Sequence, residues 1–421
     1  MPIFYKSLKP ILDSLINISE ALYDQNNFKK IGKNYLGVFG LVNNINNIKK
    51  SFAAFLASPF YGQRIAGDVI FIIDTDPLRK VIGLPKIGPD LYISDSHGFM
   101  LNHDQDIDAI DRIHLANSKN LSSICFMGGS TVMGWGARLP LFSIPALVQS
   151  IAELEFHKKI ECINCGVAAF SSQESLNLLV TEIIELKPEL VIFYDGWNCC
   201  HQFMLEQASI LSRTYPEGSR YFVGMSMRHL SYASFLKKQY EFLSLIKHCI
   251  KLAGIHFFSL LSSAAPFLWL KTFFDGLNTK FCSLAPDYYS LIINNLSKID
   301  QNILVSNMAT RYWQIHDAAQ AICQHNGIQY MTFFQPHLLW GNKKMTDNEK
   351  LYKERDQSLE LIYKAFYNKI KSVKAPDYFY DLGSAFDEIE EEMYIDAGHL
   401  NPKANILISQ YITQKINFLL K

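Results

Sequence analysis

Short apolar runs alternate with helix-forming segments along this chain, and the alternation limits the fold more than any other feature. Runs at 123–127, 160–164 and 190–194 are separated by segments whose apolar residues recur at helical spacing. Two further runs, 328–334 and 378–382, continue the pattern. Strands joined by helices of roughly three to four turns form parallel sheets. The sequence therefore predicts an α/β fold with a five-stranded parallel sheet.

Capping residues mark where the intervening helices begin. Ser143 is the expected N-cap of one helix, and Ser171 to Glu174 has the pattern of a capping box that opens the next. Asn401 followed by Pro402 is typical of the start of a helix. The helices expected from these signals and from apolar periodicity span about 144–156, 171–187, 306–326, 346–370 and 402–418, and the acidic run 387–392 is interpreted as a solvated helix face.

The chain of 421 residues is long enough for one large domain with additions. We expect an N-terminal helical and mixed extension at 1–115 and the main α/β domain at 116–421. Residues 201–304 interrupt the alternation after the third strand and are expected to form a helical insertion over the site. A lid over the site and a segment that merely packs on the core are both compatible with this position.

Composition excludes some classes of protein. Formal net charge is zero, and no stripe of Lys and Arg interleaved with aromatic residues is present, so we expect no nucleic-acid partner. The longest apolar stretch, 255–270, is shorter than the ~20 residues of a spanning helix, which predicts no transmembrane segment and leaves peripheral membrane contact open. The N-terminus lacks the pattern of a secretory signal, so we expect a cytoplasmic location.

The eight cysteines predict neither a metal site nor a disulfide framework. Most lie in apolar runs, where a free cysteine behaves as a small hydrophobic residue. Cys162 and Cys165 have the spacing of metal ligands, but no second pair or His partner lies near them, and two ligands do not complete a tetrahedral site. This usage indicates a reducing compartment.

A glycine-rich turn follows the first predicted strand and presents a hydroxyl, that of Ser130. A Gly-Ser turn alone is more typical of ordinary loop structure than of a nucleophile. Its significance changes with Asp396 and His399, which lie three residues apart on one short segment far downstream. Such a pair can join a carboxylate to imidazole Nδ1 and leave Nε2 free to take a proton from a serine.

The loops after the other predicted strands also carry polar residues. Asn164–Ala169 follow the second strand, and Asp195–Cys200 follow the third. The carboxyl ends of parallel strands meet at one edge of the sheet, where open α/β folds bind their ligands. We therefore expect these loops, Ser130 and the Asp396–His399 segment to surround one site.

These residues supply the groups that acyl transfer from an ester requires. Ser130 would attack the carbonyl, His399 would take and return the proton, and Asp396 would hold the imidazole tautomer. The oxyanion needs fixed donors, for which the candidates are the backbone N–H groups of Ser130 and Ala169 and the side-chain amide of Asn198. A role for Asn198 as a simple turn cap is the alternative.

Four blocks of this sequence, in order, resemble the motifs of the SGNH (GDSL-type) hydrolase superfamily. Gly128-Gly129-Ser130 resembles the first block, and Asn164–Ala169 resembles the second. Gly196–Cys199 resembles the third, and Asp396–His399 matches the last. The resemblance covers roughly residues 121–200 and 305–421.

Three positions depart from the pattern of this superfamily. Gly129 stands where an Asp is frequent, Ala169 where a Gly is usual, and Cys199 where an Asp is usual. Ala169 still offers its N–H, although its methyl group restricts the approach of the backbone. None of the departures removes the serine, the aspartate or the histidine.

The resemblance implies a flavodoxin-like, three-layer α/β/α fold and a serine esterase that needs no metal and no organic cofactor. It implies an ester of a small molecule or a glycan as substrate, for which an O-acetylated carbohydrate is our expectation. Gly129, Trp197 and His337 are the residues we assign to substrate binding. Packing is the alternative for Trp135 and Trp197, and a role as an ordinary polar loop residue is the alternative for His337.

Three other functions remain as alternatives. The apolar insertion could shelter a long acyl chain, as in a lipase or a thioesterase. An O-acyltransferase would use the same acyl-serine intermediate. A non-catalytic binding protein of the same fold is the alternative outside enzymes, and the altered second and third blocks motivate it.

Overall fold

The computed structural model describes residues 69–72, 90–103, 107–168, 170–212, 296–355 and 357–417. These described residues belong to two units, one within 69–201 and 305–417 and the other made of 202–212 and 296–304. Most of the expected N-terminal extension and of the helical insertion lies outside the described residues. The domain boundaries therefore stay predictions, although one described helix, α5 (Ala109–Ser118), spans the expected boundary at residue 115.

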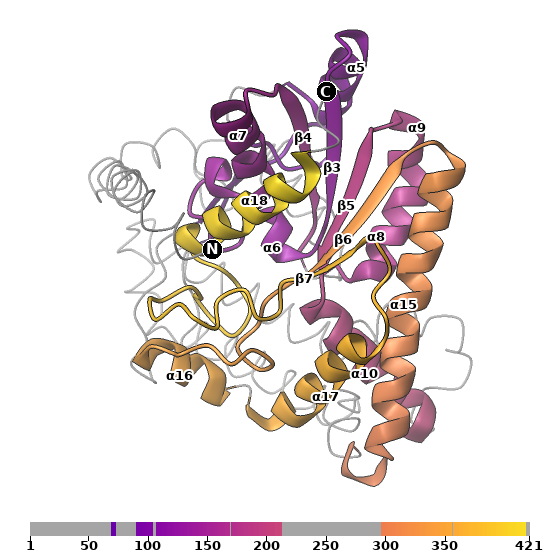
Figure 1. Cartoon of the computed structure of the whole chain (residues 1–421), viewed down its shortest axis with the longest axis vertical. Coiled ribbons are helices and arrows are strands. Elements are labelled where there is room, and N and C mark those ends of the chain that lie inside the picture. The colour runs from indigo at the N-terminus through magenta and orange to yellow at the C-terminus, as the bar shows by residue number, and fades with distance from the viewer. Residues whose placement is uncertain are drawn as a thin grey trace, which may run out of the picture. The chain divides into compact units, whose positions relative to one another are not determined.

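A five-stranded parallel sheet forms the centre of the first unit (Figure 1). The strand order is β4-β3-β5-β6-β7, which is the flavodoxin-like order in which the first strand lies between the second and the third. The predicted α/β fold is thus confirmed, because each expected apolar run is a strand. The strands are β3 (Ser122–Gly128), β4 (Ile160–Gly166), β5 (Leu190–Asp195), β6 (Gln329–Phe334) and β7 (Phe379–Asp381).

Two further strands form a separate, smaller sheet. Strand β1 (Val69–Ile72) pairs antiparallel with β2 (Asp90–Ile93). This two-stranded sheet is not part of the parallel sheet that carries the site.

Helices cover both faces of the parallel sheet (Figure 1). On one face lie α7 (Ile144–Phe156) and α18 (Pro402–Ile416), which pack against each other. The other face is covered by α5, by α15 (Gln301–His325) and by α8 (Ser172–Leu178), which a π-helical turn joins to α9. The remaining α-helices of the described residues are α6 (Ser130–Met133), α9 (Ile184–Leu186), α10 (Trp197–Ser212), α16 (Asp347–Arg355) and α17 (Glu360–Ser372).

The two faces of the sheet build two apolar cores because successive side chains of a strand point to opposite sides. Phe126 and Ile192 pack in the core that includes residues of α7 and α18. Met127 and Phe193 pack in the core that includes residues of α5, α8 and α15. Strands buried on both faces explain why the sequence shows continuous apolar runs instead of an alternating pattern.

Two of the three predicted helix caps form as expected. The Ser171 and Glu174 side chains make the reciprocal bonds of a capping box, and the Asn401 side chain accepts the N–H of Ala404. Ser143 occupies the N-cap position of α7, but its hydroxyl is buried and has no hydrogen-bond partner among the described residues. The position was predictable from the sequence, whereas the direction of the hydroxyl was not.

Two helix predictions were wrong. The helix expected at 346–370 is divided into α16 and α17 by a 3-10 turn at Gln357–Leu359. The acidic run 387–392 forms turns and irregular backbone and is not a helix. Three of its carboxylates contact other parts of the chain: Glu390 contacts Lys344, Glu391 contacts Lys403 and Glu392 contacts Asn348.

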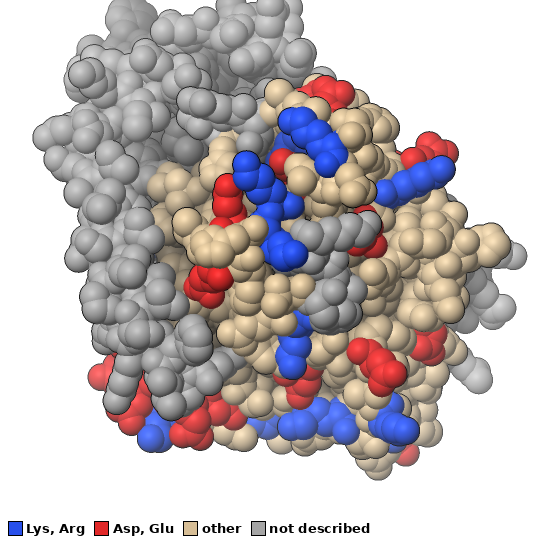
Figure 2. Space-filling model, turned by 45° about the horizontal axis from the view of Figure 1, so that its top comes forward, with Lys and Arg blue, Asp and Glu red and all other residues tan. Residues whose placement is uncertain are grey.

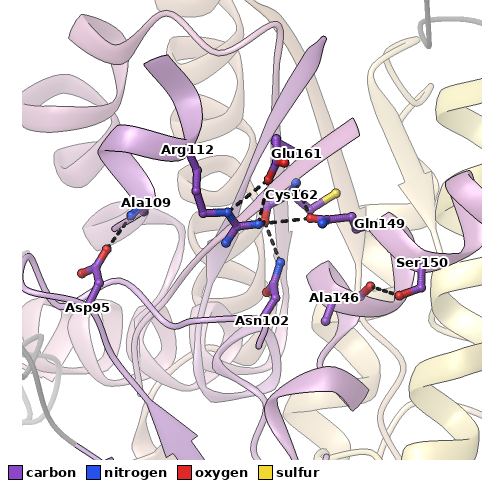
Figure 3. A network of polar contacts seen from close by, with 9 residues as sticks. All are labelled: Asp95, Asn102, Ala109, Arg112, Ala146, Gln149, Ser150, Glu161 and Cys162. Carbon is purple, nitrogen blue, oxygen red and sulfur yellow. Dashed lines mark hydrogen bonds and ion pairs between the residues drawn. The ribbon is translucent and has the colours of Figure 1, made fainter. Parts of the chain in front are cut away.

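Side chains protect the free edge of β4, the first strand in the sheet order (Figure 3). The Cys162 N–H donates to Gln149 at 2.9 Å, and its carbonyl accepts Asn102 Nδ2 at 2.7 Å. Arg112, held by Glu161 at 3.0 Å, donates to the same carbonyl at 3.2 Å. An edge strand otherwise presents unpaired N–H and C=O groups to other chains. The polar residues before and within α5 are therefore part of the sheet's architecture.

The described surface mixes charges of both signs. On the face in Figure 2, acidic and basic side chains are interspersed with uncharged residues, and its described part carries no continuous basic stripe. Within the described ranges, no helix combines the length and apolarity needed to cross a membrane. The six described cysteines, Cys125, Cys162, Cys165, Cys199, Cys200 and Cys323, are buried free thiols.

Candidate active site

Ser130, His399 and Asp396 form a continuous chain of hydrogen bonds. Ser130 Oγ lies 2.6 Å from His399 Nε2, although the two residues are 269 positions apart in the sequence. His399 Nδ1 lies 2.6 Å from Asp396 Oδ2. Ser130 and His399 are each only 9% exposed, so water competes little for these bonds. The structure thus brings together the three residues that the sequence singled out.

The surroundings of Asp396 fix the orientation of the histidine. Its Oδ1 atom accepts the backbone N–H groups of Gly398 and His399, at 2.9 and 2.7 Å. Burial raises the pKa of this carboxyl, but the charge of His399 and these hydrogen bonds outweigh it, so the pKa lies well below its ordinary value. An ionised carboxylate only accepts, so Nδ1 of His399 carries the proton and Nε2 can accept the Ser130 hydroxyl.

Ser130 lies directly after the carboxyl end of β3, at the first position of α6. Its backbone N–H has no intrahelical acceptor, because the first N–H groups of a helix lack one. A Cβ atom at Gly129 would lie 2.3 Å from Asn198 Nδ2 and 3.0 Å from the Phe170 carbonyl. The absence of a side chain at residue 129 therefore allows the Asn198 amide to lie against the turn that carries Ser130.

Asn198 and Cys199 connect the start of α10 to the loop after β4. Asn198 Nδ2 donates to the Phe170 carbonyl at 2.9 Å, and Cys199 Sγ accepts the Ser172 N–H at 3.2 Å. Burial, with the nearby Asp195 charge, raises the pKa of the Cys199 thiol well above its ordinary value, so it stays protonated. A neutral thiol thus braces this loop at the position where a carboxylate was expected from the family pattern.

The Asp396–His399 loop packs closely against aromatic rings. A Cβ atom at Gly398 would lie 2.4 Å from Cε3 of Trp197 and 2.7 Å from Cδ2 of His337. The Trp197 ring meets the His399 ring edge-on, with centroids 4.9 Å apart. Only a glycine fits at this position while both rings stay in place.

Trp135 contacts His399 from the segment that follows α6. The two rings stack at 30° with centroids 5.5 Å apart. The backbone N–H of Trp135 donates to the Ser130 carbonyl at 2.8 Å, which ties the indole to the serine turn. The sequence interpretation of Trp135 as a packing residue missed this contact, and its only signal was the closeness of Trp135 to Ser130 along the chain.

His337 lies beside the three polar residues but differs from His399 in its partners. It is fully buried, and its ring meets Trp197 with centroids 5.0 Å apart. Its Nδ1 accepts the Leu339 N–H at 3.0 Å, which places its proton on Nε2. Burial lowers its pKa to about 3, so the ring is neutral at ordinary pH.

Most residues that we assigned to the site from the sequence therefore lie together. Ala169 lies outside the described residues, so its expected role as a donor stays a prediction. No group of three or more His, Cys, Asp or Glu side chains suited to a metal is found in the described part of the chain. A buried ion pair, Lys343 with Glu349, escaped the sequence interpretation. Glu349 also accepts the N–H groups of Met393 and Tyr394, which lie 44 and 45 positions away and were not visible as partners.

Comparison with known proteins gives only distant similarity. No protein-family model and no curated protein matches the sequence. The lipase Lip_vut3 from a goat rumen metagenome is 10% identical, with a TM-score of 0.37 over 70% of this chain and 96% of that one. The acetyl xylan esterase AlAXEase is 10% identical, with a TM-score of 0.34 over 70% and 99%. The lipase/acylhydrolase from Enterococcus faecalis is 10% identical, with a TM-score of 0.34 over 72% and 98%. Similarities this low carry no conclusion about function.

Proposed function

We propose that the protein is a serine esterase that cleaves O-acyl esters through an acyl-serine intermediate. The observation that carries this proposal is the chain of contacts from Ser130 Oγ to His399 Nε2 and from His399 Nδ1 to Asp396, each 2.6 Å long. A nucleophile within hydrogen-bond reach of a base, with a third group that orients the base, is the arrangement that activates a hydroxyl.

In the proposed reaction, Ser130 Oγ attacks the ester carbonyl while His399 Nε2 takes the hydroxyl proton. His399 then donates that proton to the leaving alcohol, which leaves the acyl group on Ser130. Water, activated by His399 in the same way, releases the acid and regenerates the serine. Asp396 holds the imidazole in the tautomer that leaves Nε2 free, and stabilises the imidazolium.

The tetrahedral intermediate would be stabilised by donors at the serine turn. The Ser130 N–H at the start of α6 and the Asn198 amide beside Gly129 are the described candidates. Asn198 Nδ2 carries two hydrogens, of which one serves the Phe170 carbonyl, so the second is available to an oxyanion. The N–H of Ala169 is the third proposed donor.

The substrate class we propose is a short-chain ester, such as an O-acetyl group on a carbohydrate. The support is the pair of indoles, Trp135 and Trp197, that contact His399 from two elements. Aromatic faces next to the proton donor suit the apolar face of a sugar leaving group. Gly129 and His337 keep the substrate-binding roles we assigned them only within this proposal. A cytoplasmic location likewise remains a proposal.

Turnover of p-nitrophenyl acetate by the wild type and by Ser130→Ala tests the proposal. We expect turnover that disappears in the variant while its unfolding temperature stays the same. A series of p-nitrophenyl esters of increasing chain length then separates an acetyl esterase from a lipase or thioesterase, and transfer to an added sugar identifies an acyltransferase. Equal rates for both proteins, together with no fluorophosphonate labelling, would favour the non-catalytic binding protein.

A further inference from the structure

The Asp396–His399 segment is the tip of a loop that closes on itself. Ile395 N–H donates to the His399 carbonyl at 3.0 Å, and Asn401 N–H donates to the Met393 carbonyl at 3.0 Å. These bonds define the stem of the loop, residues 393–395 and 399–401. The stem fixes the shape of the loop but not its position relative to Ser130, so bonds from other elements must set that position.

One such bond comes from Leu338, whose N–H donates to the Ala397 carbonyl at 2.9 Å. Another contact involves Glu349 of α16, the helix beside the loop between β7 and α18 (Figure 1). Glu349 Oε1 accepts the N–H groups of Met393 and Tyr394, at 2.9 and 3.3 Å. These two residues lie directly before Ile395 and Asp396, so Glu349 holds the stem where it leads into the tip.

The other carboxylate oxygen of Glu349 faces its own helix and a lysine. Oε2 accepts Lys343 Nζ at 2.7 Å and the Thr346 N–H at 2.9 Å. Glu349 is completely buried and Lys343 is only 6% exposed. The four donors saturate both oxygens, which is the condition under which a buried carboxylate is tolerated.

A neutral side chain with an acceptor oxygen would be enough at residue 349 if its role were only to cap α16. The capping box of Thr346 and Glu349 uses one oxygen and leaves the other to solvent in an ordinary helix. Here the second oxygen is buried and committed to the stem of the loop. The charge of Lys343 compensates for the cost of burying the Glu349 carboxylate. The ion pair therefore allows this carboxylate to bind the stem of the loop.

We propose that Glu349, neutralised by Lys343, is a positioning residue that places the Asp396–His399 loop against Ser130. The inference rests on the proposed function, because it assigns Glu349 to the histidine and aspartate of that reaction. Glu349 touches neither Ser130 nor His399 and acts through the backbone of Met393 and Tyr394. Its loss would lower turnover of bound substrate and leave substrate binding nearly unchanged.

Two double variants separate positioning from stability. Lys343→Met/Glu349→Gln and Lys343→Met/Glu349→Met both remove the ion pair, and both place an unbranched side chain of similar length at residue 349. They differ at residue 349: the amide oxygen of Gln can still accept the N–H groups of Met393 and Tyr394, whereas Met has no such oxygen. Replacing a buried ion pair by neutral groups of similar volume is often compatible with stability.

We expect the Gln double variant to keep kcat within about threefold of wild type. The Met double variant should lose kcat by about tenfold to a hundredfold, with KM within about twofold, since small misplacements of reacting groups cost that much. The downfield proton resonance between His399 and Asp396 should persist in the Gln protein and broaden in the Met protein. Lys344→Ala, which removes the exposed contact with Glu390, is the matched control and should leave both readouts unchanged.

Equal kcat values and equal resonances in the two double variants would overturn the inference and leave Glu349 as a structural cap. Should the Met double variant not fold, Glu349→Asp replaces it, because this change keeps the charge for Lys343 but shortens the reach to the stem. An unchanged kcat in Glu349→Asp would contradict the inference equally. If Ser130→Ala kept full turnover, the proposed function would fail instead, and the resonance would still show whether Glu349 positions the loop.

Discussion

The rings of His399 and His337 both contact the indole of Trp197. Their Nδ1 atoms have opposite hydrogen-bonding roles. The rings of His399 and His337 lie with centroids 4.9 and 5.0 Å from that of Trp197. His399 Nδ1 faces the Asp396 carboxylate, while His337 Nδ1 accepts a backbone N–H from Leu339. Similar packing therefore gives one ring that can exchange a proton with Ser130 and one that is held neutral.

The difference between the two Nδ1 partners shows that burial alone does not decide which role a histidine can take. His337 is the more buried of the two, and burial lowers its pKa to about 3. His399 is oriented by a carboxylate whose own pKa the same contact lowers. The partner at Nδ1, more than the apolar surroundings, decides which role each ring can take.

Replacement of Asp396, the carboxylate partner of His399, should have the largest effect on kcat/KM. Asp396→Asn leaves the shape of the loop but offers an NH₂ group to Nδ1, which favours the wrong imidazole tautomer. We expect kcat/KM for p-nitrophenyl acetate to fall by a factor on the order of 10⁴. In contrast, His337→Phe should lower it by less than about tenfold. Losses of similar size in the two variants would remove the distinction between the rings.

Gly398→Ala tests how closely Trp197 and His337 confine the His399 loop. The new methyl group would lie 2.4 Å from the Trp197 ring, so the loop or the rings must shift. We expect kcat to fall by about a hundredfold, because a displacement of about 1 Å can cost that much. The double variant Trp197→Ala/Gly398→Ala should recover part of this loss. A Gly398→Ala protein with wild-type kcat would show that the rings do not confine the loop.

His337 should make the folded protein sensitive to acid. The folded state takes up the His337 proton only near pH 3, whereas the ordinary pKa is 6.5. Between these values the unfolded state binds more protons, so the free energy of unfolding falls as pH falls, by up to about 1.4 kcal/mol per pH unit. Asp396 also lowers the free energy of unfolding as pH falls, but only below its ordinary pKa of 3.8.

Urea unfolding measures this dependence in the wild type and in His337→Phe. The variant should lose less stability than the wild type between about pH 6.5 and about pH 4.5, since it cannot take up the proton. The comparison uses the slope with pH, so a lower absolute stability of the variant does not affect it. Identical slopes would contradict the neutral state of His337.

Of the substitutions at Asp396, Gly398, His337 and Trp135, we expect those at Trp135 to have the smallest effect. Its stacking on His399 favours the imidazolium that forms during the proposed reaction, a contribution of about 0.5–1 kcal/mol. Trp135→Leu should therefore lower kcat by about two- to fivefold, and Trp135→Phe, which keeps an aromatic face, by less. A rise in kcat for Trp135→Leu would show that the indole does not assist the histidine.

The sequence predicted the parts of the molecule that local patterns determine. The strands from Ser122 to Gly128 and from Leu190 to Asp195 are apolar because both faces of the sheet are covered, so the runs were visible. Asn401 and Pro402 marked the start of α18 through ordinary capping chemistry. Ser130 was found because it follows a strand whose end was recognisable, and Asp396 and His399 were found because their spacing suits a carboxylate–imidazole pair.

Contacts that depend on distant residues were not predictable in the same way. No Pro or Gly marks the break between α16 and α17, so no stop signal was visible there. The acidic run was interpreted as a solvated helix face from its charge pattern. Its partners, such as Lys344 and Asn348, are too distant in sequence for that pattern to reveal them. Glu349 showed only the spacing of a capping box, and its bond to Met393 crosses 44 residues.

Fluorophosphonate labelling, with the labelled residue located by mass spectrometry, would show whether Ser130 is an activated nucleophile. We predict one adduct on Ser130 in the wild type, no adduct in Ser130→Ala, and much slower labelling in Asp396→Asn. Because the probe reacts with an activated serine whatever the natural ester is, selectivity for an unusual substrate does not hide the result. An adduct on another residue, or labelling of Asp396→Asn at the wild-type rate, would contradict the proposal that Asp396 and His399 activate Ser130.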